Sequence, residues 1–263
     1  MPMSMTKRYY SGLTDPGLLR SSNQDAYFID SLGRFFIVAD GMGGHAGGQE
    51  ASRLATEAIR NYLDEHWKDD RGTDLLLKEA LLSANQVILD DQMRHPERAD
   101  MGTTVVVLAF REGDHSPWCA HVGDSRLYRL RGHHLDQITE DHTWIARAIR
   151  EGELSPSQSR THPWRHVLSQ CLGREDLNQL DIQPLEVNPG DRLLLCSDGL
   201  TEELSDHLIA SHLKSIRSCD AAAAALISSA KQRGGRDNIT VVIVALQAVP
   251  ESSAPEVTAP GSA

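Results

Sequence analysis

An α+β fold, with antiparallel sheet layers covered by helices, is predicted by three features of the sequence. Strands and helices occur in separate blocks along the 263 residues instead of alternating one by one. The strands in the middle of the chain are joined by segments too short for helical crossovers, which favours antiparallel pairing. No internal repeat or linker divides the chain. These features argue against a doubly wound parallel sheet.

Seven strands are predicted by short runs of β-branched, aromatic and other apolar residues. They cover residues 34–39, 103–110, 118–122, 126–130, 135–139, 191–197 and 239–246. The four strands between residues 103 and 139 are predicted to form one meander. A further apolar run, residues 26–29, follows Asp25.

Helices are predicted where apolar residues recur at a spacing of three or four. The first begins after Gly48, and the second covers about residues 74–93 with Thr73 or Asp74 as its N-cap. A short helix is expected near residues 144–149. Ser205 and Asp220 are the expected N-caps of two helices near the C-terminus.

The formal charge of −11 disfavours nucleic acid and anionic membrane surfaces as partners. No apolar stretch is long enough to cross a bilayer, and the N-terminus has no apolar core of signal-peptide type. The four cysteines are widely spaced, which disfavours a zinc site or a disulfide scaffold. We therefore expect a cytoplasmic protein. Residues 248–263, rich in Pro, Ala, Ser and Glu, are predicted to be a disordered tail.

Five aspartates lie at the ends of apolar strands, and they are Asp25, Asp40, Asp124, Asp198 and Asp237. A single Asp-Gly after a strand is typical of a turn, but turns do not explain Asp25 or Asp237. Converging carboxylates would repel one another, and a hard divalent cation relieves this repulsion. Oxygen ligands suit Mg²⁺ or Mn²⁺. The pattern predicts a multi-carboxylate metal site of the kind that handles phosphate with two ions.

Two features near these aspartates suit a phosphate ligand. Arg20 lies five residues before Asp25 and offers a bidentate fork to phosphate oxygens. The glycines at 41, 43, 44, 47 and 48 allow close backbone approach just before a helix. No Gly-Lys-Ser/Thr follows them, so this is not a nucleotide P-loop.

Six motifs, in this order, resemble the bacterial branch of the metal-dependent protein phosphatases, the type 2C serine/threonine phosphatases. They are RSSNQD at 20–25, VADGMGGH at 38–45, MGTT at 101–104, HVGDSR at 121–126, CSDGL at 196–200 and RDNIT at 236–240. The resemblance covers about residues 10–246. It implies a catalytic domain over residues 8–247 with a four-layer α-β-β-α sandwich, in which helices flank two stacked antiparallel sheets.

The resemblance also implies a chemistry, namely hydrolysis of phosphoserine and phosphothreonine by a water that bridges two Mn²⁺ or Mg²⁺ ions. By resemblance, Arg20 binds the substrate phosphate and Asp40 bridges both ions. The other implied ligands are the Gly41 carbonyl, Asp25, Asp198 and Asp237, with Asp124 and Asp198 at a weaker third metal position. The implied partners are phosphorylated proteins and a bacterial Ser/Thr kinase, and we expect a monomer.

Some positions depart from the wider family. Met42 stands where eukaryotic members carry a histidine proposed as general acid. The donor of the leaving-group proton is therefore either His45 or a metal-bound water, and His45 is equally a candidate structural hydrogen-bonder. Residues 141–172 match the family's flap beside the active site, although His166, Gln170 and Cys171 differ from the expected residues. We expect the other histidines to lie at the surface.

Two alternative functions remain open from the sequence. One is a non-catalytic phosphoprotein-binding module on the same fold, although such modules lose metal aspartates and this chain keeps them. The other is a regulatory phosphatase of the anti-sigma-antagonist type.

Overall fold

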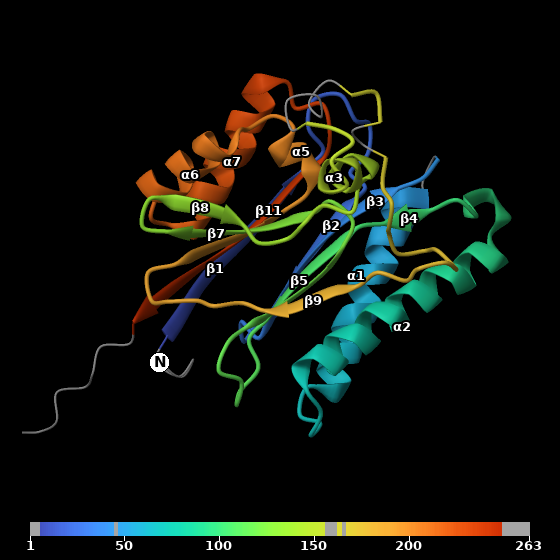
Figure 1. Ribbon diagram of the computed structural model, residues 1–263, viewed down its shortest axis with the longest axis horizontal. Coiled ribbons are helices and arrows are strands. Elements are labelled where there is room, and N and C mark those ends of the chain that lie inside the picture. Colours follow the sequence, from blue (N-terminus) through green and yellow to red (C-terminus); the bar gives the residue numbers. More distant parts are fainter. Residues whose placement is uncertain (1–5, 45–46, 156–161, 165–166, 249–263) are drawn as a thin grey trace, which may run out of the picture.

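The computed structural model describes residues 6–44, 47–155, 162–164 and 167–248. These residues form two antiparallel sheets stacked face to face, with helices against both outer faces (Figure 1). The predicted α+β, four-layer sandwich is thereby confirmed. No helix in these ranges is long and apolar enough to span a membrane. Apart from Ala248, the predicted tail lies outside the described residues.

Each sheet has five strands in its main hydrogen-bonded path. In the first sheet the order is β1 (Thr6–Asp15), β11 (Ile239–Ala248), β10 (Arg192–Cys196), β7 (Arg126–Arg131) and β8 (His134–Gln137). In the second sheet the order is β2 (Asp25–Ile29), β3 (Phe35–Met42), β5 (Val105–Ala109), β6 (Trp118–Val122) and β9 (Asp181–Pro184). The short β4 (Gly102–Thr103) also pairs with β3.

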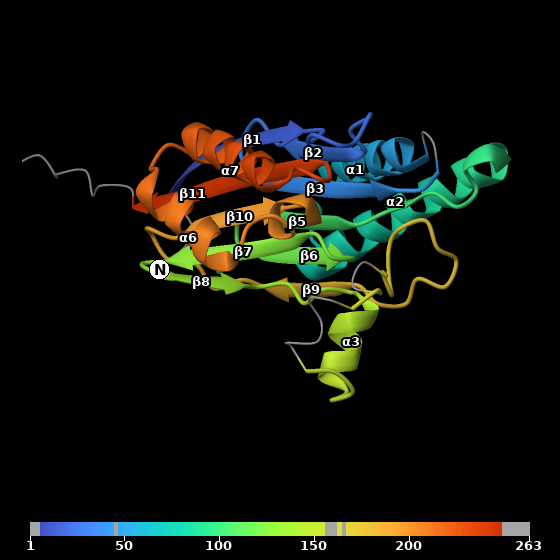
Figure 2. The same ribbon diagram turned by 90° about the horizontal axis from the view of Figure 1, so that it is seen from above.

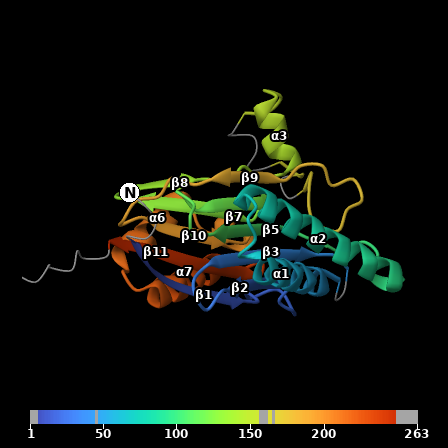
Figure 3. The ribbon, with the colours of Figure 1, turned by 90° about the horizontal axis from the view of Figure 1, so that it is seen from below.

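The helices form the outer layers. The second sheet is covered by α1 (Gly47–His66) and α2 (Thr73–Arg94), and the first by α6 (Asp206–Ser215) and α7 (Cys219–Arg233). Short helical turns occur at η2 (Pro96–Arg98) and α5 (Asp198–Thr201). Helix α3 (Trp144–Arg150) projects beyond the edge strands β8 and β9 (Figures 2 and 3).

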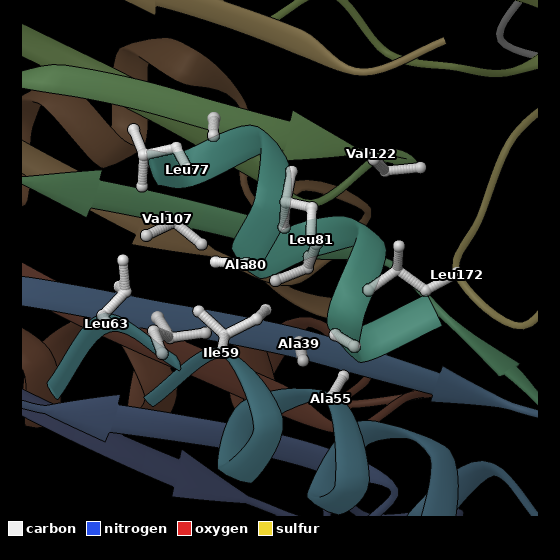
Figure 4. Packing of buried hydrophobic residues seen from close by; sticks show 14 of the residues in the cluster. Ala39, Ala55, Ile59, Leu63, Leu77, Ala80, Leu81, Val107, Val122 and Leu172 are labelled. Carbon is white, nitrogen blue, oxygen red and sulfur yellow. The ribbon is translucent and has the colours of Figure 1, made fainter. Parts of the chain in front are cut away.

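The four layers enclose three separate cores. On the second sheet, Ile59 and Leu63 of α1 and Leu81 of α2 belong to one cluster with Ala39 and Val107 (Figure 4). The inner faces of the two sheets bury a second cluster, and α6 and α7 bury a third against the first sheet. Because one face of each outer helix and both faces of each sheet are buried, side-chain packing holds the two sheets face to face.

The predicted meander is wrong, because the chain changes sheets between β6 and β7. β5 and β6 form a hairpin in the second sheet, whereas β7 and β8 form a hairpin in the first. The crossing is made by residues 123–125, where Gly123 has φ of +102°. Asp124 therefore lies at the point where the chain passes from one sheet to the other.

Two predicted helix caps are also wrong. The N-cap of α2 is Gly72, and Thr73 instead donates a hydrogen bond to Asp114 at 2.7 Å. The N-cap of α7 is Ser218, whose hydroxyl accepts from the Ala221 N–H at 3.3 Å. Ser205 is the N-cap residue of α6 as predicted, although its side chain makes no capping bond.

Strands β1 and β9 were not among the predicted strands, because both are edge strands with weak apolar patterns. β1 begins with Thr6, Lys7 and Arg8, and β9 is the sequence Asp-Ile-Gln-Pro. Residues on edge strands are only partly buried, so their sequences carry little of the usual strand signal.

Neighbouring leucines on α2 give a test of the packing in Figure 4. Leu81 is fully buried, whereas Leu82 is 41% exposed. Leu81→Ala should lower the free energy of unfolding by about 2–5 kcal/mol because it leaves a cavity. Leu82→Ala should change it by about 0.5 kcal/mol or less. Urea denaturation of both variants measures the difference, and equal effects would contradict this placement of α2.

Candidate active site

Antiparallel pairing brings four of the predicted aspartates together in two pairs. In an antiparallel pair, the end of one strand lies beside the beginning of its partner. Asp25 at the beginning of β2 therefore pairs with Asp40 near the end of β3. Asp198 follows β10 and Asp237 precedes β11, and these two strands are neighbours in the first sheet.

Asp25 connects the two sheets at the site. One of its carboxylate oxygens, Oδ2, accepts hydrogen bonds from Ser197 Oγ at 2.7 Å and Thr240 Oγ1 at 2.6 Å. The other, Oδ1, is buried and has no hydrogen-bond partner among the described residues. A buried carboxylate oxygen without a donor is costly. This free oxygen fits a metal cation, which would supply the missing positive charge.

The backbone around Asp40 is fixed by two threonines and a glycine. The Asp40 N–H donates to Thr104 Oγ1 at 3.1 Å, and the Asp40 carbonyl accepts from Thr103 Oγ1 at 2.8 Å. A Cβ atom on Gly41 would lie 1.9 Å from the carbonyl oxygen of Gly48. Only glycine at position 41 allows α1 to begin against the end of β3.

Asp124 is tied to this region through the residue that follows it. The hydroxyl groups of Ser125 and Thr104 are hydrogen-bonded at 2.7 Å in a buried position. Thr104 therefore links the turn that carries Asp124 to the backbone of Asp40. The third-metal position implied by the sequence and the central aspartate belong to one connected network.

Four of the carboxyl groups, those of Asp25, Asp40, Asp124 and Asp198, have raised pKa values, as expected for crowded acids. Burial, with repulsion from Asp237, raises the pKa of Asp25 to about 6, although the hydrogen bonds from Thr240 and Ser197 lower it. Burial and the same neighbour raise the pKa of Asp198 to about 6. Burial and repulsion from neighbouring aspartates, Asp198 among them, place the pKa values of Asp40 and Asp124 well above the usual range. A bound cation would reverse this preference for protons.

The five aspartates form a row, in which Asp40 lies between Asp25 and Asp198, and Asp198 also faces Asp124 and Asp237. Among the described residues, His121, His142 and Asp181 each offer a potential ligand atom, and these three atoms lie within 4.8 Å of one another. None of the five aspartates belongs to such a group of three in the described part of the chain. An all-oxygen donor set spread over such a row suits more than one Mn²⁺ or Mg²⁺ ion.

Arg20 lies at the exposed side of the row. Its guanidinium is 2.6 Å from the carboxylate of Asp237, and this hydrogen bond raises the pKa of Arg20. The Arg20 side chain is 53% exposed, so its remaining N–H donors are open to a ligand.

A cleft of about 1080 Å³ begins at Asp124 and Asp198 and runs between α3 and the segment after α5. Ile145 and Ile149 line one wall, and Ser205 and Asp206 belong to the other. The cleft is at least as large as the pockets that bind whole small-molecule ligands, and it opens beside the aspartates.

Several predicted positions differ or lie outside the described residues. His45 and His166 are outside them. The expectation that the other histidines lie at the surface is wrong for His121 and His142, which are 1% and 4% exposed. Both pack beside β9, a strand that was not predicted.

Sequence reasoning also missed the hydroxyl residues that hold the aspartates. Ser197, Thr240, Thr104 and Ser125 all lie within motifs that were recognised. Their signal was therefore available as polar residues in buried strand ends, next to the candidate ligands.

Comparison with known proteins identifies the family. The family model described as protein phosphatase 2C matches residues 20–231. Serine/threonine protein phosphatase PstP of Mycobacterium tuberculosis (strain ATCC 25618 / H37Rv) is 38% identical over 237 residues, which are 89% of this chain and 44% of PstP. The chain thus spans less than half the length of that relative. Protein phosphatase PhpP of Streptococcus pneumoniae serotype 2 is 35% identical over 246 residues, covering 89% of this chain and 96% of PhpP.

A solved structure agrees with these matches. The crystal structure of the PstP catalytic domain in complex with two manganese ions superposes with a TM-score of 0.79 at 33% identity. It covers 92% of this chain and 99% of that one. Since the family model matches most of the chain and PhpP matches it over nearly its whole length, the chain belongs to the protein phosphatase 2C family.

Proposed function

We propose that this chain is a Mn²⁺- or Mg²⁺-dependent phosphatase that hydrolyses phosphoserine and phosphothreonine in proteins. The observation that carries the proposal is the row of desolvated carboxylates with raised pKa values beside the half-exposed Arg20. The names of PstP and PhpP, and the two manganese ions in the PstP structure, support it.

The proposed metal ligands are the five aspartates and one carbonyl. Asp40 stands between Asp25 and Asp198, both of which repel its carboxylate, so it is placed to share two ions. Asp124, which Asp198 repels most among its charged neighbours, would hold a third ion together with Asp198. The complete proposed set is Asp25, Asp40, Gly41 (carbonyl), Asp124, Asp198 and Asp237.

Arg20 is the proposed receptor for the substrate phosphate. Its planar fork can donate two parallel hydrogen bonds to phosphate oxygens and so fix the orientation of the ester. When bound, Mn²⁺ or Mg²⁺ supplies Lewis acidity that polarises the phosphoryl group and lowers the pKa of water toward neutrality. In this proposal Arg20 fixes the position of the phosphate, and the aspartates supply the negative charge that holds the cations.

The partners follow from this chemistry. We infer that the substrates are proteins phosphorylated by a Ser/Thr kinase, and that the enzyme acts on them as a monomer in the cytoplasm. A phosphoproteome comparison of the wild-type host with an Asp40→Asn strain would identify them as the phosphosites that accumulate.

A non-catalytic binding module is disfavoured, because all five aspartates are retained and crowded.

Asp40→Asn should abolish metal-dependent activity. The substitution removes the central charge, and a loss of about a thousandfold or more in kcat is expected from the several kcal/mol that metal ions contribute to such reactions. Release of phosphate from a phosphothreonine peptide in the presence of Mn²⁺ measures it. Glu57→Gln on the exposed face of α1 is the control. Full wild-type activity in excess EDTA would contradict the proposed function.

Stability of the metal-free protein should fall as the pH rises. Asp25 and Asp198 have folded pKa values of about 6, above the value of about 3.9 for an unfolded carboxyl group. The folded state therefore holds protons that the unfolded state releases, and stability is lost as the pH rises from about 4 through about 6. Thermal unfolding in EDTA measures this trend.

Added Mn²⁺ should raise the melting temperature more at about pH 7.5 than at about pH 5, because protons compete with the cation at low pH. Asp25→Asn, which removes one of the buried charges, should reduce the pH dependence of the stability of the metal-free protein. A metal-free protein whose stability increases through this pH range would contradict the raised pKa values.

Arg20→Lys should raise KM for phosphopeptides and lower kcat/KM by about ten- to a hundredfold. Lysine keeps the positive charge but loses the bidentate fork. Steady-state kinetics with Arg53→Lys as a control on α1 would separate this loss from a general effect of the substitution. An unchanged kcat/KM would exclude Arg20 as the phosphate receptor.

A further inference from the structure

His142 makes a buried contact with the turn that carries Asp124. The backbone N–H of His142 donates to the Gly123 carbonyl at 2.9 Å. In return, the backbone N–H of Gly123 donates to His142 Nδ1 at 3.2 Å in a buried position. The side chain of His142 is 3% exposed. The imidazole thus serves as the hydrogen-bond acceptor of a backbone amide one residue before Asp124.

The hydrogen bonds of His142 determine its tautomer. Since Nδ1 accepts from the Gly123 N–H, it carries no proton, and the neutral ring must carry its proton on Nε2. Nε2 lies 3.2 Å from Asp181 Oδ2 on strand β9 and 3.3 Å from the amide nitrogen of Gln179, which also donates to Asp181 Oδ1 at 3.5 Å. A carboxylate at this position favours the Nε2–H tautomer, as carboxylates beside functional histidines commonly do. Asp181 therefore keeps Nδ1 free to accept from Gly123.

The turn at Gly123 depends on outside contacts to keep its shape. Gly123 has φ of +102°, and a Cβ atom there would lie 2.6 Å from Thr104 Cβ. The Ser125–Thr104 hydrogen bond holds the turn on one side of Asp124, and His142 holds it on the other. Without an acceptor, the buried Gly123 N–H would lose its partner, at the usual cost of an unsatisfied donor.

We propose that His142 and Asp181 are a positioning pair for Asp124. Asp181 fixes the tautomer of His142, and His142 fixes the turn, so that Asp124 is presented to a cation in one orientation. The inference rests on the proposed role of Asp124 as a ligand. It assigns a function to two residues that contact neither the substrate nor the row of aspartates in the described structure.

A metal site made by His121, His142 and Asp181 is the competing interpretation, since one ligand atom of each lies within 4.8 Å of the others. His121 would suit it, because its Nε2 lies 2.9 Å from the Glu140 carbonyl and its Nδ1 is buried without a partner among the described residues. His142 would not. A ligating histidine normally donates from its second nitrogen, whereas Nδ1 of His142 faces the N–H donor of Gly123.

Two substitutions separate the two nitrogens of His142. In His142→Asn, the amide oxygen can take the place of Nδ1 and accept from Gly123, but the side chain is too short to reach Asp181. In His142→Gln, the amide nitrogen can take the place of Nε2 and donate to Asp181, but no acceptor remains for Gly123. Asn is one methylene shorter than Gln and removes more volume from the same buried site, so a loss of packing alone would affect His142→Asn more than His142→Gln, the reverse of the expected order.

The first measurement uses metal-free protein and needs no activity. Amide hydrogen exchange at Gly123 should be slow in the wild type and in His142→Asn, and about tenfold faster or more in His142→Gln. The ¹⁵N spectrum of the wild-type His142 ring should show an unprotonated Nδ1 and a protonated Nε2. Observation of the opposite tautomer would overturn the proposal, even if neither variant folds.

The second measurement is Mn²⁺ binding by calorimetry. The affinity of the weakest-bound ion should fall about tenfold in His142→Gln and stay within about threefold of the wild type in His142→Asn. Asp181→Asn, at a partly exposed position, should weaken the same ion. A purely structural role would lower the melting temperature of the variants without separating their Mn²⁺ affinities, and this result would overturn the proposal.

Two further outcomes are distinguishable. Stoichiometric Zn²⁺ binding that is lost in Asp181→Asn would overturn the proposal in favour of the competing metal site. Failure of the proposed phosphatase function would appear as activity that survives Asp40→Asn or EDTA, whereas failure of the positioning pair would appear as unchanged Gly123 exchange and Mn²⁺ affinity in an otherwise metal-dependent enzyme.

Discussion

The hydrogen bonds from Ser197 and Thr240 to Asp25 are the contacts on which the site depends. The two hydroxyl donors belong to the first sheet, and the carboxylate belongs to the second. They therefore fix how far one sheet is shifted along the other, which side-chain packing between the sheets alone would define less sharply. A shift by one residue would move the facing aspartates by about 3.3 Å, more than a metal–oxygen distance. The pair Asp25 and Asp40 faces the pair Asp198 and Asp237 only in this alignment.

The same arrangement is the reason that we expect cations to stabilise the site. Each sheet contributes its acids at one end, and burial removes the water that would otherwise screen them. Most of the 37 acidic residues can be solvated at the surface, but Asp40 and Asp198 lie among other carboxylates that repel them. Arg20 forms an ion pair with Asp237 and so neutralises one charge of the row. The energy stored in this repulsion becomes binding energy for divalent ions, so that metal affinity and reduced stability of the metal-free protein have one cause.

Much of the fold was predictable because it follows from local patterns. The apolar spacing of α1 and the β-branched runs of β5 and β11 are strong signals, and Asp-Gly at the end of β3 marked one part of the site. The crossing at Gly123 was not predictable, since a short connection between two strands fits a hairpin and a change of sheet equally well. The pairing of His142 with Asp181 was also hidden, because the two residues are distant in sequence and β9 has no clear strand pattern. Contacts between sheets depend on tertiary packing, which leaves no periodic trace in the sequence.

The ion pair of Arg20 with Asp237 adds a link between metal binding and substrate binding. In the structure, the carboxylate of Asp237 has the guanidinium of Arg20 as its direct cationic partner. If Asp237 holds a cation as proposed, that cation would compete with Arg20 for the carboxylate and weaken the ion pair. The side chain is 53% exposed, so its release requires little rearrangement. The freed guanidinium fork then faces an approaching phosphate, whose negative charge replaces that of Asp237. With Asp237 as a metal ligand and Arg20 as the phosphate receptor, the two proposed roles would be coupled through one shared carboxylate, and the protein would have a physical reason to bind substrate after its cations.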